Sequence, residues 1–128
     1  MILDSSAIVA ILLKEPGWED LFEKVATTEV AAVGGATLAE AALVLTVKMG
    51  RSGRTTLSAF LRETGLTVIP FGEAHWHTAA DAFWHFGKGR HRAALNFGDC
   101  MSYAVARLSG QPLLCTGNDF SRTDLALA

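Results

Sequence analysis

Short apolar runs alternate along the chain with longer segments in which apolar residues recur every three or four positions. The short runs predict strands at Met1–Leu3, Val30–Val33, Leu66–Ile69, Pro112–Cys115 and Leu125–Leu127. The periodic segments predict helices over Ala7–Leu13, Trp18–Thr27, Thr37–Met49, Arg54–Glu63, Glu73–Phe86 and Gly98–Leu108, with a short helix near Asp119. Strands that alternate with helices favour an α/β fold, in which a mostly parallel sheet carries helices on both faces.

The predicted helix Thr37–Met49 is apolar nearly all round. Leu43, Val44 and Val47 share one stripe with Glu40, and further apolar side chains fill the other side. We expect such a helix to be buried. Because buried helices rarely carry an unpaired carboxylate, Glu40 is a candidate functional residue.

Composition predicts one globular domain over residues 1–128. Half of the residues are hydrophobic, 19% are charged, and the formal net charge is −2, so attraction to nucleic acid must be local. Cys100 and Cys115 form no CxxC pair and are expected to be reduced thiols of a cytoplasmic protein. The apolar run Ala7–Leu13 is much shorter than the ~20 residues that a membrane span needs.

Four acidic residues stand where the predicted elements change. Asp4 directly follows the first strand, Glu40 comes soon after the second, and Asp119 lies four residues beyond Cys115, where a later strand ends. Ligands of parallel sheets gather at the carboxyl ends of the strands, so these acids are expected at one edge. Asp99 begins a helix, with its side chain free to face the same edge. A divalent cation would compensate several carboxylates at once, and the pattern predicts a shared metal site.

Helix capping is the competing interpretation of the same acids, because carboxylates in a first helical turn satisfy free N–H groups. Three acids end a sequence that resembles a capping box: Thr37-x-x-Glu40, Asn96-x-x-Asp99 and Thr116-x-x-Asp119. Two observations favour function. Glu40 lies in an otherwise apolar helix, and Asp4 is the only charged residue among the first thirteen.

Four stretches carry a family resemblance: MILDSSAIVAILLKEP, GGATLAEAALVL, KGRHRAALNFGDCMSYAVA and PLLCTGNDFSRTDLALA. With the four spaced acids, they make the chain resemble a PIN domain from end to end, specifically a VapC-type toxin ribonuclease of a toxin–antitoxin pair. The resemblance implies a three-layer α/β/α fold and an endoribonuclease that uses Mg²⁺, which Mn²⁺ can replace. It also implies a homodimer and a cognate antitoxin whose C-terminal segment covers the acid edge.

The resemblance assigns the site residues one by one. Asp4, Glu40, Asp99 and Asp119 match the four acids of the family in order, as metal ligands and catalytic residues. Ser6 occupies the small hydroxyl position two residues after the first acid, and Thr116 is a further supporting residue.

A basic cluster, Lys88, Arg90, His91 and Arg92, lies in the glycine-containing segment Gly87–Leu95, before the predicted helix Gly98–Leu108. We call it the basic loop. It suits the phosphates of RNA or an acidic segment of the antitoxin, and the alternative is a solvated loop without a partner.

Carboxylates that hold Mg²⁺ or Mn²⁺ can hydrolyse a phosphodiester without a His or Ser nucleophile. A second class remains open, a phosphoacceptor or ligand-binding α/β module with regulatory Mg²⁺. Such a module usually has a strand-end Lys, whereas this chain offers Thr116 and Asn118 there. A third option, a purely structural interaction protein, predicts no stabilisation by metal. The RNA sequence that is cut does not follow from the sequence.

Overall fold

The computed structural model describes all residues, 1–128, and its centre is a four-stranded parallel sheet. The strand order is β3 (Thr67–Ile69), β2 (Ala32–Gly34), β1 (Ile2–Leu3) and β4 (Leu113–Leu114). Ile2 is in register with Ala32 on one side and with Leu113 on the other. The strands β2, β1 and β4 are therefore neighbours, and their carboxyl ends point the same way.

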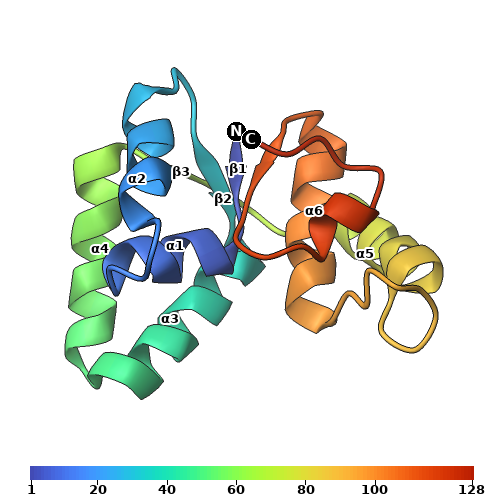
Figure 1. Cartoon of the computed structure of the whole chain (residues 1–128), viewed down its shortest axis with the longest axis horizontal. Coiled ribbons are helices and arrows are strands. Elements are labelled where there is room, and N and C mark those ends of the chain that lie inside the picture. Colours follow the sequence, from blue (N-terminus) through green and yellow to red (C-terminus); the bar gives the residue numbers. More distant parts are fainter.

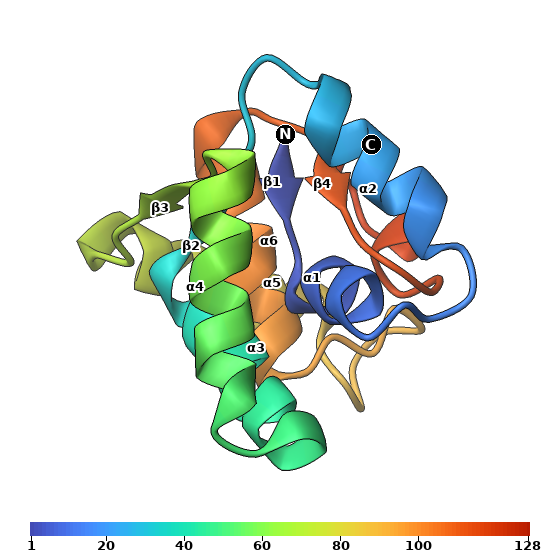
Figure 2. The ribbon, with the colours of Figure 1, turned by 90° about the vertical axis from the view of Figure 1, so that its left-hand side faces the viewer.

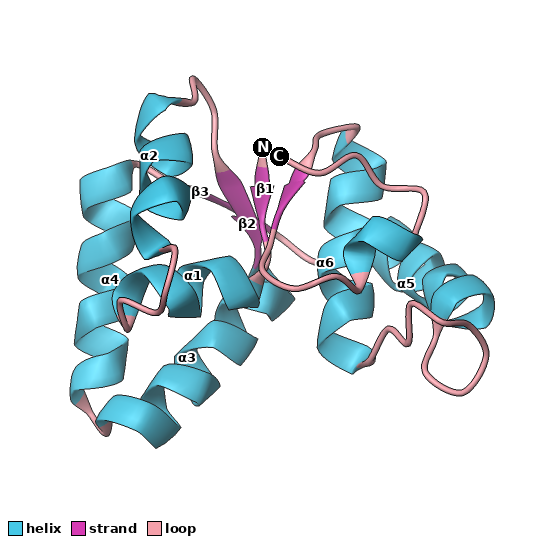
Figure 3. Ribbon diagram, in the orientation of Figure 1, coloured by secondary structure: helices cyan, strands magenta, loops and turns pink.

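Helices cover both faces of this sheet (Figures 1 and 3). One side carries α1 (Ser5–Leu12), α2 (Trp18–Thr27), α3 (Gly35–Met49) and α4 (Ser52–Thr64). The other side carries α5 (Glu73–Phe86) and α6 (Phe97–Ser109), followed after β4 by a short 3₁₀ helix, η1 (Phe120–Arg122). The predicted three-layer α/β/α sandwich is confirmed. None of its helices is both long and apolar enough to cross a membrane.

Alternation along the strands supplies two hydrophobic cores. Successive strand residues point to opposite faces, so Leu3 packs into the core beneath α1–α4 while Ile2 packs into the core beneath α5 and α6. Leu113 and Leu114 divide in the same way. Both faces are buried, which explains why the strands are apolar runs rather than alternating segments.

Helix α6 lies unusually close to the sheet. A Cβ atom on Gly34, the last residue of β2, would be 2.7 Å from Cγ2 of Val105. Only glycine permits this approach, because real Cβ atoms do not come so near to another carbon. The close packing brings the start of α6 beside the carboxyl ends of β2 and β1.

Two predictions about the elements are wrong. Helix α3 is buried only along its inner face, because its 15 residues run far beyond strands of two or three residues, and Leu43 and Val47 are 70% and 83% exposed. The predicted strand Leu125–Leu127 reduces to one bridge between Leu127 and Leu113. The chain then ends beside α2 (Figure 2), where Lys24 Nζ donates a hydrogen bond to the Ala128 carbonyl oxygen at 3.1 Å.

Candidate active site

The sheet topology places the predicted acids along one edge. Asp4 directly follows β1 and is the N-cap residue of α1, Glu40 lies in α3 after β2, and Asp119 lies between β4 and η1. Asp99 lies in the first turn of α6. These elements follow the three neighbouring strands or pack against them, so the acids gather at the carboxyl ends of β2, β1 and β4.

Asp4 is a buried carboxylate held by hydroxyl groups. It is 3% exposed. Its Oδ2 accepts hydrogen bonds from the backbone N–H and the hydroxyl of Ser6, at 3.1 and 2.6 Å, and its Oδ1 accepts one from the Ser102 hydroxyl at 2.5 Å. Neutral donors therefore fix the side chain, and no cationic side chain pairs with it.

Ser6 also connects two strand ends. Its hydroxyl oxygen accepts a hydrogen bond from the Thr116 backbone N–H at 3.1 Å, while its proton goes to Asp4. The start of α1 is thereby tied to the segment after β4. The predicted supporting position of Ser6 fits this contact, whereas Thr116 contributes its backbone and has an exposed residue surface.

Glu40 is fixed from two directions. The Ser5 hydroxyl donates a short hydrogen bond to Glu40 Oε1. Gly98, at the start of α6, lies against the same carboxylate so closely that a Cβ there would overlap Glu40 Oε2. Sequence reasoning missed both Ser5 and Gly98 as site residues. Their only signal in the sequence is that Ser5 directly follows Asp4 and Gly98 directly precedes Asp99.

The other three acids affect the pKa of Asp99. It forms a capping box with Asn96, in which the Asn96 N–H donates to Asp99 Oδ2 at 3.0 Å and the Asp99 N–H donates to Asn96 Oδ1 at 2.9 Å. Burial raises the pKa of Asp99 to about 6, the hydrogen bond from Asn96 opposes the shift, and the charges of Asp4, Asp119 and Glu40 add to it. Each of the other three acids therefore lies within electrostatic reach of Asp99.

Capping explains only part of this arrangement. Asp4 and Asp99 do cap α1 and α6. Glu40 forms no capping box, since α3 begins at Gly35, and Asp119 precedes η1 without any side-chain hydrogen bond. Asp119 is exposed and is the least constrained of the four acids.

The acids lack a compensating charge. The ion pairs of the structure are His77–Glu73 and Arg107–Asp124, both outside this site. No group of three His, Cys, Asp or Glu side chains stands close enough in this arrangement to hold a metal ion together. The donor chemistry nevertheless fits a hard divalent cation, because four carboxylates meet at one edge and no Lys or Arg neutralises them.

A thiol close to the acids is chemically quiet. Burial raises the pKa of the Cys115 thiol to about 11, and the charges of Asp4, Asp99 and Asp119 act in the same direction. The thiol stays protonated at neutral pH, so it is no nucleophile. The site offers carboxylates as its only charged groups.

The basic loop lies between α5 and α6, and its Lys and Arg residues are exposed. The Arg90 guanidinium lies 4.3 Å from the ring centre of Trp84, a cation–π contact that orients the loop on α5. Lys88, Arg90 and Arg92 form no ion pair. Their charges stay available to an anionic partner.

Comparison with known proteins agrees with this geometry. The PIN domain family matches residues 1–125. The chain is 46% identical to ribonuclease VapC36 of Mycobacterium tuberculosis, covering 98% of this chain and 91% of that protein. It is 41% identical to the ribonuclease VapC of Mycolicibacterium smegmatis, covering 98% of both chains.

Solved structures share the fold at lower identity. VapC20 of Mycobacterium tuberculosis, described as a toxin that cleaves the sarcin–ricin loop, matches with a TM-score of 0.79 and 19% identity over 99% of this chain and 97% of that one. VapBC2 of Rickettsia felis, solved with a DNA fragment from its promoter, matches with a TM-score of 0.78 and 18% identity, covering 99% and 96%.

An α/β/α sandwich with four acids at the carboxyl edge of its parallel sheet defines the class, and the full-length matches define the group within it. The chain belongs to the PIN-domain family, among its VapC ribonucleases. The resemblance noted from the sequence is confirmed.

Proposed function

We propose that this protein is the toxin of a toxin–antitoxin pair, a single-domain endoribonuclease that depends on Mg²⁺, with Mn²⁺ as a substitute. The single observation that carries the proposal is the set of four acids at one sheet edge. Asp4 is buried, and none of the four forms an ion pair with a basic side chain. The names of the full-length relatives, which are ribonucleases, support the same activity.

Each acid has a role in this proposal. Asp4, Glu40, Asp99 and Asp119 hold the cation directly or through water, and Ser5, Ser6 and Asn96 keep three of them in place. A cation held by these residues would supply positive charge against the phosphate and would lower the pKa of a water molecule. Without a cation, burial and the neighbouring acids raise the pKa of Asp99 to about 6, and a cation held by these residues would favour its ionised form.

RNA is the proposed substrate, with the basic loop as a phosphate contact. Lys88, Arg90 and Arg92 are exposed and unpaired, and the loop leads directly into Asn96 and the start of α6. Positive charge at this point would hold the RNA backbone near the acids while the net charge of the protein stays negative.

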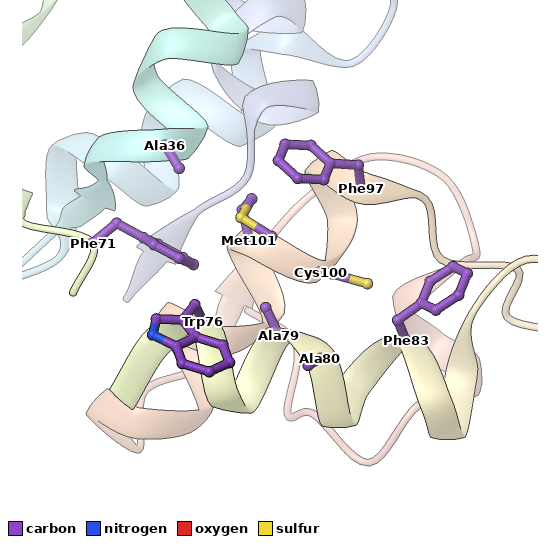
Figure 4. Close-up of a pocket in the computed structure, with 9 residues that line it drawn as sticks. All are labelled: Ala36, Phe71, Trp76, Ala79, Ala80, Phe83, Phe97, Cys100 and Met101. Atoms are coloured by element: carbon purple, nitrogen blue, oxygen red, sulfur yellow. The ribbon is translucent and has the colours of Figure 1, made fainter. Parts of the chain in front are cut away.

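An apolar surface beside the acids supports a homodimer. A depression of about 600 Å³ between α5, α6 and α3 is lined by hydrophobic residues alone (Figure 4): Ala36, Phe71, Trp76, Ala79, Ala80, Phe83, Phe97, Cys100 and Met101. Phe97 is 79% exposed at its rim, and alanines form part of its floor. One surface thus offers both a projecting ring and a hollow, as a two-fold interface requires.

The proposed antitoxin would inhibit by covering the acid edge, where a Lys or Arg from its C-terminal segment could pair with the carboxylates. A solved toxin–antitoxin complex from Klebsiella pneumoniae contains a chain with this fold, at a TM-score of 0.72, which supports an antitoxin here. We place the protein in the cytoplasm, consistent with its two free cysteines.

RNA digestion tests the activity. Purified protein is incubated with mixed RNA in the presence of Mn²⁺, with chelator, and with Mn²⁺ restored after chelation. Cleavage that disappears with chelator and returns with Mn²⁺ is expected. Metal binding without cleavage would instead favour the regulatory Mg²⁺ module. A thermal midpoint that does not change on addition of Mn²⁺ would favour a structural protein.

A further inference from the structure

A buried chain of hydroxyl groups connects two helices to Asp4. The Ser102 hydroxyl of α6 donates to Asp4 Oδ1 at 2.5 Å, and the Thr37 hydroxyl of α3 lies 3.0 Å from that of Ser102. Ser102 and Thr37 are 0% and 1% exposed, so water does not compete for these hydrogen bonds. Helices α3 and α6 also carry Glu40 and Asp99, so the chain joins the carriers of three acids.

The protons in this chain have a fixed order. An ionised carboxylate only accepts, and a hydroxyl has a single proton to donate. Since the Ser102 proton goes to Asp4, Ser102 must accept the proton of Thr37. Hydrogen bonds are therefore donated from Thr37 to Ser102 and from Ser102 to Asp4. Loss of the Ser102 hydroxyl removes both hydrogen bonds, whereas loss of the Thr37 hydroxyl leaves the one from Ser102 to Asp4.

The two carboxylate oxygens of Asp4 accept different numbers of hydrogen bonds. A carboxylate oxygen has about two acceptor positions. Oδ2 uses both for Ser6, through the backbone N–H and the hydroxyl, whereas Oδ1 uses one for Ser102. One acceptor position of the buried carboxylate is left, and it is on Oδ1.

We propose that Ser102 is a positioning residue of the site, which fixes Asp4 through Oδ1 so that the remaining position of that oxygen is presented to the divalent cation. The inference rests on the proposed function, because it assigns a role toward the cation. Without Ser102, Asp4 could rotate about its side-chain bonds around the Ser6 contacts alone. The cation would then bind less tightly, although every acid is still present.

Ser102→Ala and Thr37→Val distinguish this positioning role from a purely structural role, in which the Thr37–Ser102 hydrogen bond only holds α6 against α3. Both variants remove the Thr37–Ser102 hydrogen bond, but only Ser102→Ala removes the donor to Asp4. Loss of a residue that orients a metal ligand typically weakens metal affinity by about 10- to 100-fold. We expect that loss in Ser102→Ala and less than about a threefold change in Thr37→Val, which keeps the orienting hydroxyl.

Calorimetric titration with Mn²⁺ measures this directly, alongside thermal melts of the metal-free proteins. Ser102→Cys, which keeps the size of the side chain but is a weak donor, replaces Ser102→Ala if the latter does not fold. In RNA digestion, the Mn²⁺ concentration for half-maximal cleavage should rise about tenfold in Ser102→Ala, with the RNA KM at saturating Mn²⁺ unchanged.

Two results would overturn the role of Ser102: Mn²⁺ affinity equal to wild type in a folded Ser102→Ala or Ser102→Cys protein, or an equal loss of affinity in Thr37→Val. Either result leaves the proposed function standing if the wild type cleaves RNA with Mn²⁺. Failure of the proposed function has a different signature, in which the wild type binds Mn²⁺ and cleaves no RNA.

Discussion

Gly98→Ala adds one methyl group at the point where α6 meets Glu40. The new Cβ would overlap Glu40 Oε2 and lie 2.5 Å from Cδ, an approach that real Cβ atoms essentially never show. The obstacle is the end of a flexible side chain, so Glu40 moves rather than the backbone. Its hydrogen bond from Ser5 is then broken or displaced.

The expected effect on stability is small. Alanine favours a helix over glycine by about 0.5–1 kcal/mol, and loss of the Ser5–Glu40 hydrogen bond costs about 1 kcal/mol. The two terms nearly cancel and leave at most about 0.5 kcal/mol, so the thermal midpoint should move by no more than about 3 °C. Activity should respond much more, because displacing a reacting group by about 1 Å can cost about 10²-fold.

Initial rates of RNA cleavage with Mn²⁺ and thermal melts check both numbers. Gly72→Ala is the matched control, since a Cβ at Gly72 meets nothing within 4 Å. The double variant Gly98→Ala with Glu40→Asp should regain part of the rate, because the shorter side chain withdraws from the new methyl group. A folded Gly98→Ala protein with the wild-type rate would refute the placement of Glu40 in the site.

Three further predictions address pH, RNA and assembly. Mn²⁺ should stabilise the protein more at pH 7 than at pH 5. The pKa of Asp99 is raised from 3.8 to about 6, so the stability that Asp99 contributes to the metal-free fold is present below about pH 4 and is lost as the pH rises toward 6, and cation binding relieves that loss. Thermal midpoints measured at both pH values should show a smaller difference in Asp99→Asn. Replacing the Lys and Arg residues of the basic loop with Ala should flatten the log–log salt dependence of RNA binding by about one unit for each phosphate interaction removed and raise KM, whereas an unchanged slope would indicate a solvated loop. Phe97→Glu should lower the mass seen by light scattering from dimer to monomer, and Val30→Glu, at an exposed apolar residue outside the depression, should not; a wild-type protein that is monomeric at micromolar concentration would contradict the dimer.

Periodicity predicted most of the fold because burial imposes it. The strands at residues 2–3 and 113–114 are fully buried and therefore appear as apolar runs. The same reasoning misjudged α3, since an apolar stripe reports that a surface will be covered without saying by what. Leu43 and Val47 are exposed within this chain, and Leu43 lines a second hollow that shares Phe97 and Met101 with the depression where a second copy is proposed to dock.

The acids were predictable from their positions after strands, but their supports were not. Asp4 and Glu40 stand out as lone charges in apolar segments. Ser102 and Thr37 are 65 residues apart in the sequence and lie on different helices, so their contact exists only once α3 and α6 pack together. Gly98 looked like an ordinary residue at the start of a helix, because a close approach by Glu40 is a property of tertiary packing.

Asp4→Asn tests the role of the acids most directly, with Mn²⁺ titration and RNA cleavage measured on the same preparation. The substitution keeps the shape of the buried side chain and removes its charge, so the fold should survive. Asp20→Asn, at an exposed residue of α2 away from the strand ends, is the control. We expect Asp4→Asn to lose Mn²⁺ binding and most cleavage while Asp20→Asn retains both. An Asp4→Asn protein that binds Mn²⁺ and cleaves RNA as the wild type does would contradict a metal-dependent site built on Asp4.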